Sequence, residues 1–155
     1  MVSFKYLLGL AGVAAATVNS TVFGGQGQIR TLWNSAPYTD LGCLTSAGQW
    51  TANPSLCAVF TAVRPGSIFT LTTSAGPCEI SGANFTCGAG NTPGQFGIWP
   101  WPNSPPKIES LRWGQYGLMS TPSPNPISAS DAAVTLRYTS YWDSGYYVWL
   151  TWKGV

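Results

Sequence analysis

Apolar and polar residues alternate in two runs near the C-terminus. The first run is Val134, Thr135, Leu136, Arg137 and Tyr138. In the second run, one side carries Tyr146, Val148, Leu150 and Trp152, and the other carries Tyr147, Trp149 and Thr151. A period of two is typical of a strand, because successive side chains point to opposite faces. An Asp-Ser-Gly turn at positions 143–145 separates the runs, so we predict that they pair as a hairpin.

Shorter apolar runs between turn residues predict further strands. They lie at positions 58–63, 68–72, 84–87, 108–113 and 116–119, with edge strands at 22–23 and 29–33. A Pro65-Gly66 turn joins the strands at 58–63 and 68–72. No helical period is sustained after the N-terminal region. The pattern therefore predicts an all-β fold, a disulfide-stapled antiparallel β-sandwich or barrel.

Two proline-rich stretches interrupt this pattern. The first, at positions 91–107, contains Trp99 and Trp101, and the second lies at positions 120–130. Proline cannot donate a hydrogen bond to a central strand ladder. We expect the first stretch to be a loop or the rim of a sheet, and the second to be a loop.

The N-terminus resembles a secretory signal peptide. Lys5 precedes a short apolar run at positions 6–16, which ends in three alanines. This run is too short to span a bilayer, and small residues are typical of a cleavage site. We predict a signal peptide at residues 1–16 and a single β-domain at 17–155. The alternative is an N-terminal core helix. The mature protein is expected to be secreted, extracellular or associated with the cell wall, with no membrane segment.

The four cysteines are grouped in the middle of the chain. They allow three disulfide connectivities, and the sequence alone does not choose among them. We favour pairing between neighbours, Cys43 with Cys57 and Cys78 with Cys87, because each pair brackets a turn-rich loop. An even number of cysteines in a secreted chain is typical of disulfides. Without CxxC spacing or histidine, we expect no metal and no cofactor.

Two sequons predict N-glycosylation. They are Asn19-Ser20-Thr21 and Asn84-Phe85-Thr86, whereas Pro54 disqualifies the triplet that begins at Asn53. Asn84 lies inside the second cysteine loop, and a glycan there would place that loop at the surface.

The charges are few and scattered. Without Lys5 the chain has six basic residues and five acidic ones. Nucleic-acid binding depends mainly on clustered positive charge, so we expect no nucleic-acid partner. The protein is predicted to be a monomer.

The absence of histidine limits the chemistry. It excludes a Ser-His-Asp triad, a Cys-His pair and a two-histidine ribonuclease centre. A carboxylate pair of the kind that glycosidases use is still compatible with the sequence. Glu79, Glu109, Asp131 and Asp143 are separate in sequence, and each can equally be a turn, cap or solvated residue. We therefore expect no catalytic residue and no enzyme activity.

The aromatic residues are better candidates for ligand binding. Trp99 and Trp101 lie on the proline-rich stretch, where an exposed indole can stack on a sugar ring. The alternative is that they anchor the loop to the core. Tyr147 and Trp149 form a second candidate pair, and the alternative for them is packing on the second face of a sandwich strand. Trp50, inside the first cysteine loop, is expected to cover the disulfide.

The cysteine region resembles a known family. The segments GCLTSAGQWT, AVFTA, FTLTTSAGPCEI and FTCGAG are similar to the C-terminal accessory domain of fungal secreted ribonuclease T2-like enzymes. The similarity covers residues 42–96 and continues more loosely through WGQYGL and YYVWLTW. It implies an all-β, disulfide-bearing, non-catalytic module in which the four cysteines are structural. No residue matches the histidine motifs of the catalytic domain, and we expect the module to stand alone after the signal peptide.

These observations lead to three hypotheses. The first is a fungal-type secreted, non-catalytic module that binds cell-wall polysaccharide through exposed aromatics at Trp99, Trp101, Tyr147 and Trp149. The second is an effector-like module that binds an extracellular protein and no glycan. The third is a carboxylate-pair hydrolase. Exposed indoles would favour the first hypothesis, and a large apolar patch would favour the second.

Overall fold

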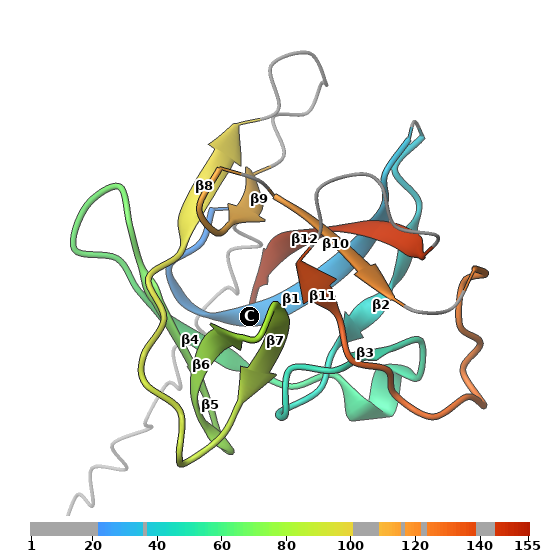
Figure 1. Ribbon diagram of the computed structural model, residues 1–155, viewed down its shortest axis with the longest axis horizontal. Coiled ribbons are helices and arrows are strands. Elements are labelled where there is room, and N and C mark those ends of the chain that lie inside the picture. Colours follow the sequence, from blue (N-terminus) through green and yellow to red (C-terminus); the bar gives the residue numbers. More distant parts are fainter. Residues whose placement is uncertain (1–21, 36, 101–108, 116, 122–123, 139–144) are drawn as a thin grey trace, which may run out of the picture.

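A computed structural model describes residues 22–35, 37–100, 109–115, 117–121, 124–138 and 145–155 (Figure 1). Within these ranges the chain forms strands, and its one helix is a single 3-10 turn, η1 (Pro54–Leu56). The strands are β1 (Gly25–Trp33), β2 (Asp40–Leu44), β3 (Trp50–Thr51), β4 (Phe60–Val63), β5 (Thr70–Thr73), β6 (Gly76–Ser81), β7 (Asn84–Cys87), β8 (Gly97–Pro100), β9 (Glu109–Arg112), β10 (Leu118–Thr121), β11 (Arg137–Tyr138) and β12 (Tyr146–Gly154). The predicted all-β fold is confirmed.

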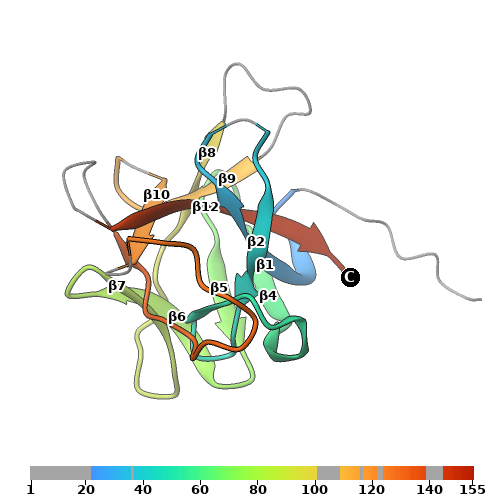
Figure 2. The same ribbon diagram turned by 90° about the vertical axis from the view of Figure 1, so that its right-hand side faces the viewer.

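In the described part of the chain, eight antiparallel strands close into a barrel. Their order is β1-β4-β5-β6-β7-β11-β10-β12, and β12 returns to β1. The closing pair runs from Gly27 opposite Gly154 to Trp33 opposite Val148. Strands β2 and β3 extend the sheet beside β1, while β9 and β8 extend it beside β12 (Figures 1 and 2). Of the two predicted architectures, a β-sandwich or a β-barrel, the structure is a barrel.

Strand β1 is central, so the predicted edge strand at positions 29–33 is wrong. One side of β1 pairs with β12, and the other pairs first with β4 and then with β2. The glycines near its start allow close packing. A Cβ at Gly27 would lie only 2.4 Å from Cε2 of the Trp152 indole. Gly27 is therefore required for the close contact across the closing pair.

The interior of the barrel is strongly aromatic. The Phe23 ring stacks on Phe69 with a centroid separation of 4.9 Å, and Phe96 lies 5.7 Å from Phe85. Strand β12 contributes Val148, Leu150 and Trp152, as its alternation predicted. Burial of such side chains is the main favourable term in the stability of the barrel.

The predicted hairpin between the last two strands is wrong. Strand β10 lies between them, because Met119 is opposite Tyr138 of β11 and also opposite Val148 of β12. Strand β11 pairs on its other edge with β7. Strands β11 and β12 therefore both pair with β10 and not with each other.

The first proline-rich stretch contains a strand at the rim of the sheet. Strand β8 is the last strand of the sheet and pairs only with β9. Pro100 is tolerated at its end because an edge strand leaves N–H positions that need no partner. The expectation of a sheet rim is therefore correct for positions 97–100.

Both predicted disulfides are confirmed. Cys78 of β6 is directly opposite Cys87 of β7, with the Cα atoms 4.0 Å apart. Cys43 of β2 is bonded to Cys57, which follows η1. The two bonds fasten the strands on either side of their loops.

The N-terminal predictions fall outside the described residues. The signal peptide at residues 1–16 and the sequon at Asn19 both precede the first described position. Among the described residues, no helix is long and apolar enough to cross a membrane.

Candidate functional site

Three of the four predicted ligand-binding residues share one side of the sheet. Trp99 of β8 is opposite Ser110 of β9, which is opposite Thr151 of β12. Residues directly opposite each other in an antiparallel pair lie on the same face. Trp149 and Tyr147 follow at intervals of two along β12 and therefore lie on this face as well. We call the surface of Trp99, Ser110, Arg112, Tyr147, Trp149 and Thr151 the outer face.

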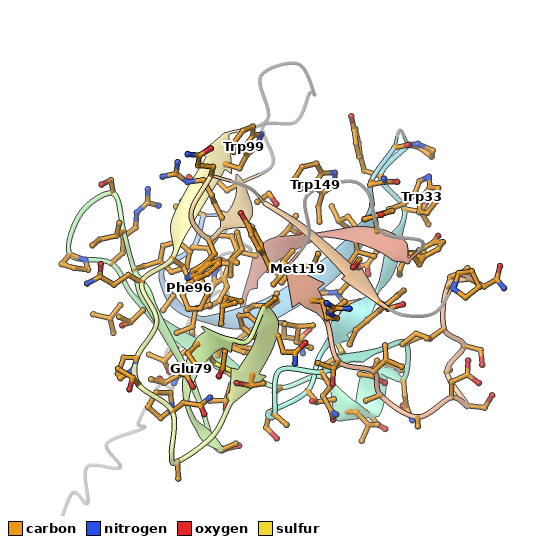
Figure 3. All side chains as sticks on the ribbon, viewed as in Figure 1. Trp33, Glu79, Phe96, Trp99, Met119 and Trp149 are labelled. Carbon is orange, nitrogen blue, oxygen red and sulfur yellow. A yellow bond between two sulfur atoms is a disulfide. The ribbon has the colours of Figure 1, made fainter. Side chains whose placement is uncertain are left out.

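The opposite side of the same strands faces the barrel interior. Val148 and Leu150 are fully buried there, together with Met119. Figure 3 shows Trp99 and Trp149 on one side of β12, and Met119 and Phe96 on the other. The alternation of β12 thus separates the core from the candidate site.

Trp99 is the exposed indole of the outer face. Its exposed fraction is 37%, and strand pairing with β9 holds its backbone. Tyr147 is half-buried and lies opposite Ser120 of β10. Trp101 lies outside the described residues, so its prediction stays untested.

Trp149 is buried, and its expected role as an exposed ligand contact is wrong. Its exposed fraction is only 6%. Gly117, the residue before β10, packs against it: a Cβ at Gly117 would lie 3.0 Å from Cζ3 of Trp149 and 3.3 Å from Cβ of Trp99. Gly117 therefore packs against both tryptophans, and Trp149 fills the space behind the exposed one.

Arg112 was missed as a candidate, and it lies beside Trp99. It is opposite Gly97 of β8, on the outer face. A Cβ at Gly97 would lie 3.0 Å from Nη2 and 3.1 Å from Nε of Arg112. The guanidinium thus covers the glycine backbone, two residues before Trp99. The only sequence feature that could have indicated Arg112 is the pairing of Gly97 with it, and this pairing cannot be recognised until the strand register is known.

Another arginine on this side of the sheet, Arg30, is engaged in an ion pair. Arg30 of β1 is opposite Thr151, and its Nε and Nη2 donate to the two carboxylate oxygens of Asp40 at 3.0 Å each. Its Nη1 also lies 3.3 Å from Sγ of Cys57. Arg30 therefore connects β1 to β2 and to the first disulfide.

The carboxylates that the structure describes have local structural partners. Glu109 accepts from the backbone N–H of Phe23 at 3.2 Å and lies 3.5 Å from Nη1 of Arg64. Glu79 accepts from the N–H of Thr92. The backbone N–H of Ser128 donates to Asp131 and lowers the pKa of its carboxyl.

No described group of three or more His, Cys, Asp and Glu side chains could hold a metal. Asp143 lies outside the described residues. The described carboxylates therefore act as caps and ion-pair partners.

A second group of aromatic residues lies at one end of the barrel. Tyr146 is 4.7 Å from Trp33 and 6.0 Å from Trp50, measured between ring centroids. Trp50 is fully buried, and its Nε1 donates to the carbonyl of Leu41. Burial raises the pKa of the Tyr146 hydroxyl. Trp50 is thus a core residue that packs on Tyr146.

Comparison with known proteins identifies the family. The profile of the RNase T2-like C-terminal domain matches residues 21–103, just over half of the chain. The chain belongs to this family. No curated protein and no solved structure gives a significant match. The matched segment of this RNase T2-like C-terminal domain covers β1 to β8 and both disulfides, whereas β9 to β12 follow it in the chain.

Proposed function

We propose that this RNase T2-like C-terminal domain is a secreted, non-catalytic module that binds cell-wall polysaccharide on its outer face. The observation that carries the proposal is the exposed indole of Trp99, held on a paired strand and backed by Gly117 and Trp149. A flat aromatic ring on a rigid element loses little conformational entropy when a ligand stacks on it.

The contact expected at Trp99 is stacking of a sugar ring on the indole. The apolar face of a pyranose can lie on the indole face, in the way that a base stacks on an aromatic side chain. Stacking of a base on an aromatic ring contributes about 1–3 kcal/mol, and we expect a similar magnitude here. Such a contact tolerates variation in the sugar, which suits a module that binds a polymer.

The absence of catalysis in this proposal is supported by how the carboxylates are used. Glycoside hydrolysis needs two carboxyl groups on either side of the scissile bond. Glu79, Glu109 and Asp131 instead accept hydrogen bonds from backbone N–H groups, and Asp40 pairs with Arg30. A hydrolase of this kind is therefore not the function that we favour.

Retention on insoluble polymers tests the proposal. The purified mature protein is incubated with chitin, β-glucan and cellulose, beside a Trp99→Ala variant. We expect retention on at least one polymer and a loss of about 5- to 150-fold in affinity in Trp99→Ala, which corresponds to the stacking energy of about 1–3 kcal/mol.

Ile68→Ala is the matched control for this assay. Ile68 is exposed to a similar extent, 41%, and lies in the loop between β4 and β5, whereas Trp99 is on the outer face of β8. The control should bind like the wild type. Retention that does not change in Trp99→Ala would refute the glycan proposal, and so would the absence of binding both to these neutral polymers and to charged saccharides.

Secretion and glycosylation at Asn84 are part of the same proposal. Asn84 follows the Gly82-Ala83 turn, where both residues have positive φ, and it is the first residue of β7, opposite Ser81 of β6. Its neighbour Phe85 is fully buried, so alternation directs Asn84 outward. The two disulfides fit an oxidising compartment.

Intact-mass analysis tests secretion and glycosylation together. The full chain is expressed in a eukaryotic secretory host, and the secreted protein is measured before and after enzymatic removal of N-glycans. We expect a mature N-terminus near Thr17 and a glycan at Asn84 that Asn84→Gln removes. A secreted product that retains residues 1–16, or that carries an unmodified Asn84, would contradict this prediction.

A second candidate is binding to an extracellular protein through the β4–β5 hairpin. This hairpin protrudes from the barrel (Figure 1), with Val63 at the end of β4 and Ile68 in the loop that follows, and the two residues are 58% and 41% exposed. Two exposed apolar side chains beside one turn would give an extracellular protein a small apolar contact. If no polymer retains the protein, the Ile68→Ala variant becomes the test of this candidate.

A further inference from the structure

We propose that the ligand of the outer face is an acidic saccharide, whose ring stacks on Trp99 while its anionic group binds Arg112. This inference rests on the proposed function and specifies the class of glycan. The anionic group is a carboxylate or a phosphate, because the guanidinium fork matches both in a bidentate geometry.

The position of Arg112 supports this assignment. Its guanidinium lies over Gly97, because a Cβ added at Gly97 would be only 3.0 Å from Nη2 of Arg112. Gly97 precedes Trp99 by two residues and is on the same side of β8. Two residues along a strand span about 6.6 Å. A pyranose ring stacked on Trp99 can therefore direct a substituent toward Arg112 without leaving the indole.

The guanidinium of Arg112 has no anionic partner in the part of the chain that the structure describes. Arg30 pairs with Asp40 at 3.0 Å, and Arg64 with Glu109 at 3.5 Å. Arg112 is half-buried but makes no ion pair and no hydrogen bond with a described residue. A partly desolvated cation is stabilised when an anion binds it. Arg112 is therefore positioned to bind the anionic group of a ligand.

The charges around Arg112 favour the same ligand. On the outer side of β1, β8, β9 and β12, the described charged residues are Arg30, Arg112 and Lys153. Glu109 of β9 is on the opposite side, because it neighbours Ser110 in the alternation. The acid nearest in register to this surface is Asp40 of β2, and Arg30 neutralises it. The face is therefore positive, which attracts an anionic ligand.

Titration calorimetry with matched saccharides tests the inference. The first pair of probes is an oligogalacturonate and the same oligomer with its carboxyl groups methyl-esterified, which keeps the rings and removes the charge. The second pair is a phosphorylated mannan oligosaccharide and its unphosphorylated form. We expect the wild type to bind one charged probe at least about tenfold tighter than its neutral counterpart.

Three variants assign the contacts. Arg112→Gln should remove the preference for the charged probe and leave the affinity for the neutral probe within about twofold of the wild type. Arg137→Gln removes the same charge from an exposed position on β11, which the strand register places on the same side as Tyr147, and it should keep the preference because Arg137 is not beside Trp99. Trp99→Ala should weaken binding of both members of the pair.

The outcomes separate this inference from the proposed function. Equal affinity for charged and neutral probes, lost in Trp99→Ala, would overturn the inference while the glycan proposal stands. A preference for charge that persists in Arg112→Gln would also overturn it, since the attraction would then be non-specific. No binding to any probe or polymer would overturn both.

Discussion

A chain that ends at residue 103 is expected to lose cooperative unfolding. This truncation keeps the segment that matches the RNase T2-like C-terminal domain but removes β9 to β12. The barrel then loses three of its eight strands, and β1 loses its partner from Gly27 to Trp33. The core loses Leu111, Met119, Leu136, Val148, Leu150 and Trp152.

The size of this effect follows from the buried area. Each of these side chains contributes about 1.5–3 kcal/mol by burial, and together they match the whole stability of a typical domain, about 5–15 kcal/mol. Urea denaturation followed by near-UV circular dichroism measures the loss. A cooperative transition in the truncated chain with a midpoint near that of the full chain would contradict the closed barrel. The residues after the matched segment are therefore expected to be part of the same folding unit.

Trp149→Ala is expected to lower the free energy of unfolding by about 3–5 kcal/mol, the usual range when a buried tryptophan is truncated. The indole is 94% buried and packs against Gly117, so its removal leaves a cavity on the outer side of β12. Urea denaturation at equilibrium measures the change.

Trp99→Ala provides the comparison for this measurement. Its indole is 37% exposed, and a surface substitution typically changes stability by about 0.5 kcal/mol. The two substitutions should thus have different effects, because Trp149 is needed for stability and Trp99 for binding. Equal destabilisation by both substitutions would contradict the burial on which this division of roles depends.

The sequence predicted strands and disulfides well because these depend on local patterns. The alternation in β12 correctly placed Val148, Leu150 and Trp152 on one side of the strand, and that side faces the core. The pairing of Cys78 with Cys87 followed from the turn that the two residues bracket. Strand order depends instead on contacts between distant segments. Nothing local to β11 or β12 indicates that β10 inserts between them, so the hairpin prediction was wrong.

The candidate site was only partly predictable for the same reason. Trp99 was identified from its proline-rich surroundings, and alternation placed Tyr147 and Trp149 on one side of a strand. The burial of Trp149 depends on Gly117, which comes from the connection between two other strands. The position of Arg112 beside Trp99 depends on the register of β8 and β9. Neither the burial of Trp149 nor the position of Arg112 can be predicted before the order and register of the strands are known.

The most direct test of the glycan-binding face is an NMR titration of the isotope-labelled protein with oligomers of chitin, β-glucan, galacturonate and phosphorylated mannan. The account predicts that the indole N–H of Trp99 and the guanidinium Nε–H of Arg112 shift with one of these oligomers, while the fully buried Trp50 does not. Shifts confined to Val63 and Ile68, or no shift with any oligomer, would contradict it.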